Sequence, residues 1–98
     1  MSVTDTAWCR QHFALMGEGG VWAVPRSGLV FTKRDGALVL TARMPWTDEL
    51  AAAAAGGADV PRSPAELRAY QDADAALIRS RFEAAGIPTR NEEKGRAS

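Results

Sequence analysis

The sequence has few of the residues that hold a small domain together covalently or through a metal: it contains one cysteine and one histidine among 98 residues. One cysteine excludes an internal disulfide framework. One cysteine and one histidine cannot supply the ligands of an ordinary zinc site within one chain. We therefore expect no metal or other cofactor, and a reducing, cytoplasmic setting.

Long apolar runs are also missing. No segment approaches about 18 consecutive apolar residues, which a membrane-spanning helix needs. The N-terminal residues Met1 to Asp5 show no basic segment ahead of an apolar one, as a secretion signal would. The sequence therefore predicts neither secretion nor a membrane span.

An excess of charge of either sign is absent as well, because 12 Lys and Arg balance 12 Asp and Glu. Affinity for nucleic acid comes mostly from neutralising phosphates, so a zero net charge argues against a protein that coats nucleic acid. The hydrophobic share of 46% and the charged share of 24% are typical of globular proteins. We expect a single small domain over residues 1–87, which gains stability from a partner that covers more of its apolar surface.

The patterns that are present predict an α+β fold that begins with a helix and a sheet. Residues 3–16 carry apolar side chains at helical spacing, and glycines follow at once. The segments 21–24, 29–34 and 37–43 are rich in β-branched and aromatic residues and are separated by turn residues, including Asp35-Gly36. They predict a three-stranded antiparallel meander.

The rest of the chain predicts further helix. Residues 47–62 indicate either a short alanine-rich helix, begun by Thr47, or a linker. Ser63-Pro64-Ala65-Glu66 combines a capping box with a proline at the first helical position, so we expect a long C-terminal helix over 64–85. Residues 88–98 lack apolar periodicity and are predicted to form a disordered tail.

The predicted sheet has apolar residues on both faces. Leu38, Leu40 and Met44 share one face, whereas Val39 lies on the other. A sheet covered by helices on one side normally shows polar residues on the other. We therefore expect a partner, either a second copy or another protein. The candidate interface residues are Trp22, Val30, Val39, Trp46, Asp74 and Arg81.

Two charged residues of the long helix fall inside its apolar stripe. Asp74 and Arg81 are seven positions apart, too far for the direct ion pair that forms at spacings of three or four. Each needs a partner from another element, or from another molecule. For Asp74 the candidates are Arg26, Arg34, Arg43 and His12.

Two other groupings support alternative functions. A basic surface on the meander, with Trp22 and Phe31 nearby, is suited to single-stranded nucleic acid, although solvated strand edges explain the same residues. Its basic residues are Arg26, Lys33, Arg34 and Arg43. A small enzyme or ligand binder would require Cys9, His12, Asp74 and Arg81 to converge in one pocket, whereas simple packing in a helix also explains Cys9 and His12.

The run from Gly19 to Phe31, followed by Leu38-Val39-Leu40 and Met44-Pro45, resembles small uncharacterised proteins encoded by actinobacteriophages. The resemblance covers about the first half of the chain and is looser in the helix after Ser63. It implies an accessory protein inside a bacterial host, and it transfers no functional residue. The leading hypothesis is therefore a non-enzymatic protein-interaction module of phage type.

Overall fold

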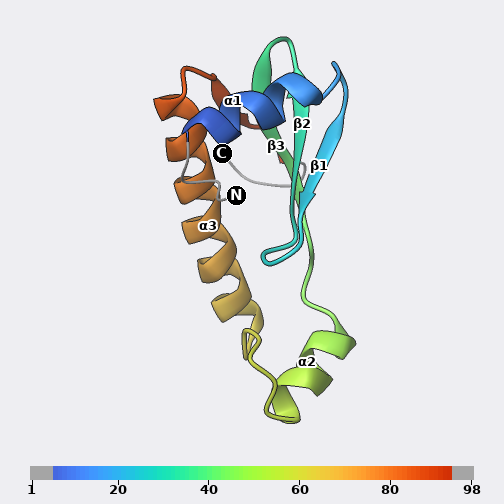
Figure 1. The fold of residues 1–98 in the computed structure, drawn as a ribbon. Coiled ribbons are helices and arrows are strands. Elements are labelled where there is room, and N and C mark those ends of the chain that lie inside the picture. The colour runs from blue at the N-terminus through green and yellow to red at the C-terminus, as the bar shows by residue number, and fades with distance from the viewer. Residues whose placement is uncertain (1–5, 94–98) are drawn as a thin grey trace.

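The computed structural model describes residues 6–93, and Figure 1 shows their arrangement. The fold is α+β, as the sequence predicts. The elements in chain order are α1 (Thr6–Leu15), β1 (Val21–Val24), β2 (Leu29–Arg34), β3 (Ala37–Arg43), α2 (Asp48–Ala55), α3 (Pro64–Ala84) and β4 (Thr89–Asn91).

The sheet has four strands in the order β1-β2-β3-β4, not the three that the sequence predicts. The antiparallel meander is confirmed, and Asp35-Gly36 joins β2 to β3 with both residues at positive φ. The fourth strand runs parallel to β3. Backbone bonds from Leu38 to Pro88 and from Glu92 to Leu40 hold it there. The predicted disordered tail over 88–98 is therefore wrong for residues 89–91, and residues 94–98 lie outside the described part of the chain.

A β-bulge changes which side chains of β3 face the helices. Phe31 pairs with Leu40 but Val30 pairs with Ala42, so Thr41 is an extra residue without a partner in the ladder. The alternation shifts by one position, and Arg43 comes to share a face with Leu29. The prediction that Met44 continues the Leu38 and Leu40 face is therefore wrong.

Both α1 and α3 lie against the same face of the sheet (Figure 1). Phe31 from β2 and Phe82 from α3 are fully buried between them. Trp8 and Trp22 pack on this core and remain partly accessible. Leu15, which the helical pattern placed in the apolar stripe, is 79% exposed because α1 ends there.

On the second face of the sheet, no helix of the described residues covers the strands (Figure 1). Val39 is nevertheless fully buried. Its neighbour on β4 is Arg90, which is joined through Glu92 to Arg34 on β2. The long methylene stems of arginine cover apolar surface while their charged ends stay in water.

The two remaining helices begin as their capping residues predict. The Thr47 side chain accepts a hydrogen bond from the backbone of Leu50, and that of Ser63 accepts one from Glu66. The alternative that 47–62 is only a linker is therefore wrong for residues 48–55. After α2 the chain is irregular as far as Ser63, so α2 and the start of α3 form an arm beyond the sheet (Figure 1).

Candidate functional site

A groove lies where this arm joins the sheet. Its volume is about 560 Å³, within the range of ligand-binding pockets. The lining is mainly apolar and comes from three separate stretches of the chain. The lining residues are Pro25, Arg26, Met44, Leu50, Asp59, Val60, Pro61, Glu66, Leu67 and Tyr70.

Gln71 on α3 fixes one wall of the groove. Its side chain is fully buried, and its amide donates hydrogen bonds to the carbonyls of Ser27 and Met44, each at 3.0 Å. These two carbonyls belong to the β1–β2 turn and to the residue after β3. A single side chain therefore holds the turn, the end of the strand and the helix in one arrangement.

Close backbone packing at the turn depends on Gly28. This residue has φ +73, and a Cβ added there would lie 2.5 Å from the Cβ of Met44. The two backbones are also joined, since the amide of Met44 donates to the carbonyl of Gly28 at 2.8 Å. Glycine is thus required for Met44 to occupy its place in the groove wall.

Arg26 of the groove is held by Asp74. Its Nη2 lies 2.6 Å from Oδ1 of Asp74 and its Nε lies 3.3 Å from Oδ2, a two-bonded pair. The Asp74 side chain is 5% exposed, whereas that of Arg26 is 50% exposed. The hydrogen bond to Asp74 raises the pKa of Arg26. The expected partner for Asp74 is therefore found within the chain, and the charge of Arg26 is balanced there.

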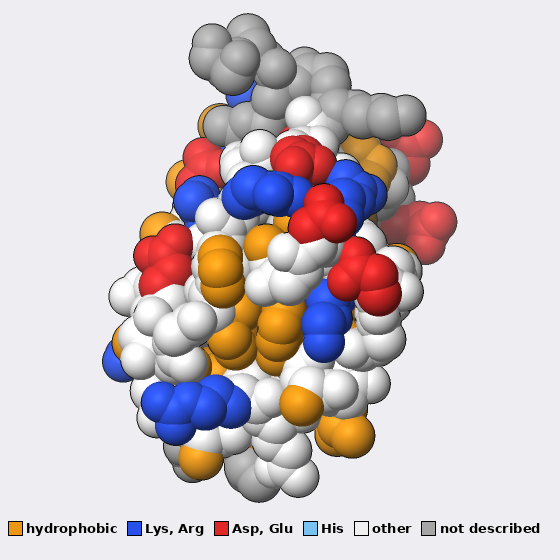
Figure 2. Space-filling view, turned by 90° about the horizontal axis from the view of Figure 1, so that it is seen from above, with side chains coloured by type: hydrophobic (Ala, Val, Ile, Leu, Met, Phe, Trp, Pro, Cys, Tyr) orange, Lys and Arg blue, Asp and Glu red, His pale blue; other side chains and the backbone are white. Residues whose placement is uncertain are grey.

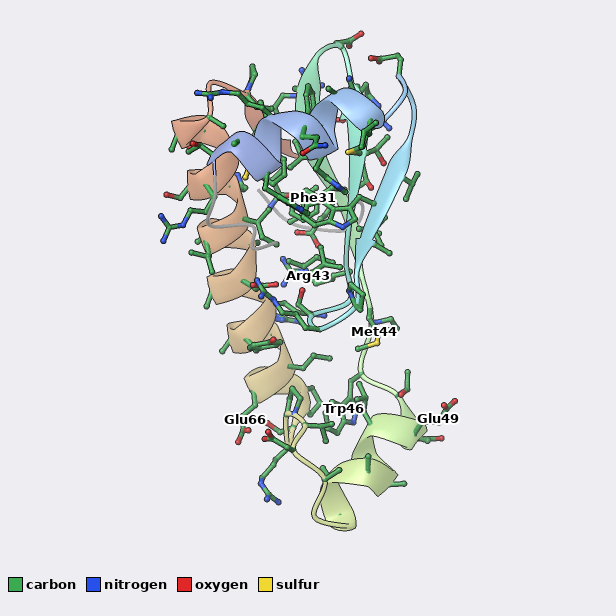
Figure 3. The ribbon with its side chains drawn as sticks, in the orientation of Figure 1. Phe31, Arg43, Met44, Trp46, Glu49 and Glu66 are labelled. Atoms are coloured by element: carbon green, nitrogen blue, oxygen red, sulfur yellow. The ribbon has the colours of Figure 1, made fainter. Side chains whose placement is uncertain are left out.

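The remaining charges in the groove wall are acidic. Asp59 and Glu66 both line it and both are exposed. Glu66 also accepts a hydrogen bond from the backbone of Arg62, the residue before the N-cap Ser63. Figure 3 shows Glu66 at the start of α3, and Trp46 between that helix and α2. With Arg26 paired, the groove presents an apolar surface of net negative charge.

The structure brings only some of the predicted interface residues near this groove. Trp46 and Asp74 lie beside it, the first half-buried and the second paired with Arg26. Val39 is fully buried in the sheet, and Val30 is half-buried on the second face. Arg81 does not cover the core as its place in the stripe predicts, because its side of α3 faces solvent.

Trp22 belongs to an aromatic cluster instead. Its ring lies 5.6 Å from that of Phe31 and 5.7 Å from that of Phe82, measured between centroids. His12 approaches it edge-on at 4.5 Å and stacks on Trp8 at 4.6 Å. Burial among these rings lowers the pKa of His12, and its Nε2 makes no hydrogen bond with the described residues.

This arrangement separates the four residues proposed for a small enzyme. His12 contacts Phe82, eight positions along α3 from Asp74, which corresponds to roughly 12 Å of helix. The Asp74 carboxylate is paired with Arg26, and the Arg81 side chain is exposed to solvent. Cys9 is fully buried. Among the described residues, these side chains do not form a common pocket.

Each basic residue of the predicted nucleic-acid surface is also engaged. Arg34 pairs with Glu92 at 2.7 Å. Arg43 pairs with Asp72 and Glu93, and the hydrogen bond to Glu93 raises the pKa of Arg43. Lys33 donates to the carbonyl of Phe13 and lies 4.3 Å from the centre of its ring. Figure 2 shows acidic and basic side chains side by side above the apolar patch at the centre of the face seen from above.

Residues 6–93 hold no group of three or more His, Cys, Asp or Glu side chains arranged for a metal ion. In the same part of the chain, no helix has both the length and the apolar composition needed to cross a membrane. No family model matches the chain, and neither the curated proteins nor the solved structures give a significant match.

Proposed function

We propose that this chain is a non-enzymatic protein-interaction module that receives a segment of another protein in the groove where the arm joins the sheet. The observation that supports the proposal is the groove itself. It combines a volume of about 560 Å³ with a wall of apolar side chains, held in place by Gln71. A hollow of this size accommodates several apolar side chains of a bound segment.

The charges of the groove define the chemistry of the partner. Arg26 is balanced by the buried Asp74, so it leaves little positive charge for a ligand. Asp59 and Glu66 then make the groove negative. A segment that carries lysine or arginine beside its apolar side chains complements this surface, whereas a segment with acidic flanks is repelled.

A binding experiment with designed peptides tests this proposal. The probe is a fluorescein-labelled peptide of about twelve residues, made of leucine and lysine, measured by fluorescence anisotropy. One matched peptide replaces lysine with glutamate and another replaces leucine with serine. We expect the leucine–lysine peptide to bind about tenfold more tightly than either matched peptide, a difference of about 1.4 kcal/mol.

Variants of the protein locate the binding. The double variant Asp59→Asn/Glu66→Gln removes both charges, and glutamine keeps an oxygen that accepts the hydrogen bond from the Arg62 amide. It should reduce the preference for lysine over glutamate at least about threefold. Glu49→Gln is the matched control, because Glu49 points away from α3 (Figure 3). Equal peptide preferences in the double variant, the control and the wild type would rule out the groove as the binding surface.

The alternative is a nucleic-acid-binding regulator. This alternative is disfavoured because Arg26, Arg34 and Arg43 are paired with acidic residues. The phage origin that the sequence resemblance implies remains a prediction and agrees with an accessory protein of this kind.

A further inference from the structure

Strand β1 forms one edge of the sheet, and neither α1 nor α3 lies along that edge (Figure 1). Val21 is 65% exposed and Ala23 is exposed, whereas Trp22 is half-buried and Val24 is buried. Proteins commonly protect such edges with lysine, proline or a bulge. The four residues of β1 include no charge and no proline, and their pairing with β2 is regular.

The backbone hydrogen bonds between β2 and the start of β1 show which backbone groups of β1 face outward. The amide of Lys33 on β2 donates to the carbonyl of Gly20 at 2.9 Å. Successive residues of a strand direct their N–H and C=O groups to alternate sides. The N–H and C=O groups of Trp22 and Val24 therefore face β2. Those of Val21 and Ala23 point away from β2, to the outer side of the edge.

We propose that this edge pairs, antiparallel, with β1 of a second copy of the chain. Identical strands related by a two-fold axis offer each other the same groups, so the contact closes as a dimer. When Val21 of one copy lies opposite Ala23 of the other, every outward N–H and C=O of both strands is bonded. Pairing Ala23 with Ala23 instead brings Pro25, which has no N–H, into the ladder.

The side chains support the same register. Trp22 then lies opposite Trp22 of the second copy at a non-hydrogen-bonded position, where cross-strand side chains approach most closely. Glu18 is three residues before Val21 and Arg26 is three residues after Ala23, so at each end the turn that carries Glu18 of one copy comes near the turn that carries Arg26 of the other. Glu18 is exposed and accepts a hydrogen bond from the Asp35 amide at Oε2, and Nη1 of Arg26, which takes no part in the two bonds to Asp74, can donate to the other oxygen of Glu18.

The length of β1 sets the strength of the contact. A four-residue strand buries far less than the roughly 1,600 Å² of a standard protein interface. The dimer should therefore dissociate on dilution and form at high concentration.

Sedimentation equilibrium between about 10 µM and about 1 mM tests the proposal. The mass of the wild type should rise from 10.5 kDa toward twice that value. Ala23→Pro removes an outward N–H without breaking the β1–β2 ladder, and should remain at the monomer mass. Ala23→Ser, the matched control, keeps the N–H and should behave as the wild type. A wild type of monomer mass at about 1 mM, or a proline variant that still dimerises, would overturn the proposal.

Cysteine cross-linking tests the register and does not depend on the proline variant folding. Val21→Cys alone, Ala23→Cys alone and an equal mixture of the two reduced variants are each oxidised, and circular dichroism confirms that both variants fold. The native Cys9 is fully buried and should not react. We expect a disulfide-linked dimer mainly in the mixture. If either variant alone cross-links as much as the mixture does, this pairing is contradicted. Asp59→Asn/Glu66→Gln should leave the dimer unchanged, which separates this contact from the groove.

Discussion

Arg26 and Asp74, 48 residues apart in the sequence, form a two-bonded ion pair that joins the β1–β2 turn to the middle of α3. Gln71, three residues earlier on the same helix, bonds to Ser27 in the same turn. These contacts set the distance between the turn and α3, and so the width of the groove. They also explain why the groove is negative, because the pair balances the charge of Arg26.

The two halves of the ion pair should respond differently to substitution. Arg26→Gln leaves the buried Asp74 carboxylate without its cation and should lower the free energy of unfolding by about 2 kcal/mol. Asp74→Asn leaves Arg26 half-exposed to water and should cost about 1 kcal/mol. Urea unfolding followed by circular dichroism measures both. Arg68→Gln, on the exposed side of α3, is the control. A larger loss in Asp74→Asn than in Arg26→Gln would contradict this account.

Gln71→Leu should destabilise the protein by about 2–4 kcal/mol. The leucine fits the buried position, but the carbonyls of Ser27 and Met44 lose their donor. Gln11→Leu, at an exposed position of α1, makes the same chemical change and should alter stability by less than about 0.5 kcal/mol. If both variants unfold at the same urea concentration, the bonds of Gln71 do not hold the groove wall.

Stability should fall as the pH is lowered below about 6.5, the ordinary pKa of histidine. Burial lowers the pKa of His12 in the folded protein, so the unfolded chain binds a proton first as the pH falls. Above pH 6.5 both states carry a neutral ring and His12 contributes no pH dependence. The midpoint of thermal unfolding, measured between about pH 7.5 and 5.5, follows this change.

His12→Phe keeps a ring among Trp8 and Trp22 but cannot titrate. The difference in midpoint between this variant and the wild type should therefore widen as the pH falls. A difference that stays constant across the same range would show that His12 is not the group responsible.

Retention on a single-stranded DNA column should be weak and nearly independent of salt. Three of the four basic residues of the meander are paired with acidic side chains within the chain, so few charges are left to neutralise phosphates and release counterions. Elution at increasing salt concentrations gives the measurement. Strong retention that the substitutions Arg26→Gln and Lys33→Gln abolish would favour the nucleic-acid alternative.

Local signals in the sequence were enough to predict most of the elements. Asp35-Gly36 fixed the hairpin, and Ser63 with Glu66 marked the start of α3. The strand β4 carried no such signal, because its three residues are held by backbone bonds to β3 and not by an apolar pattern. The sequence does not predict the bulge at Thr41 either, since the bulge depends on how β3 pairs with β2.

The sequence does not predict the groove either, because the groove also depends on contacts between distant segments. Met44, Asp59 and Tyr70 are remote in the sequence, and only the return of α3 along the sheet brings them to one cavity. The sequence predicts four candidate partners for Asp74, and the structure shows Arg26 to be the partner. The exposure of Tyr70, at 41%, and of Met44, at 37%, could not be read from periodicity because α2 stands away from the sheet.

The most direct test of the interaction module is an NMR titration of ¹⁵N-labelled protein with the leucine–lysine peptide. We expect the backbone amide shifts to move most at Val60, Leu67 and Tyr70, which line the groove, and little at Ala76 on the exposed side of α3. The leucine–glutamate peptide should cause much smaller changes at the same amides. Shifts that concentrate outside the groove, or that are the same for both peptides, would contradict the proposed function.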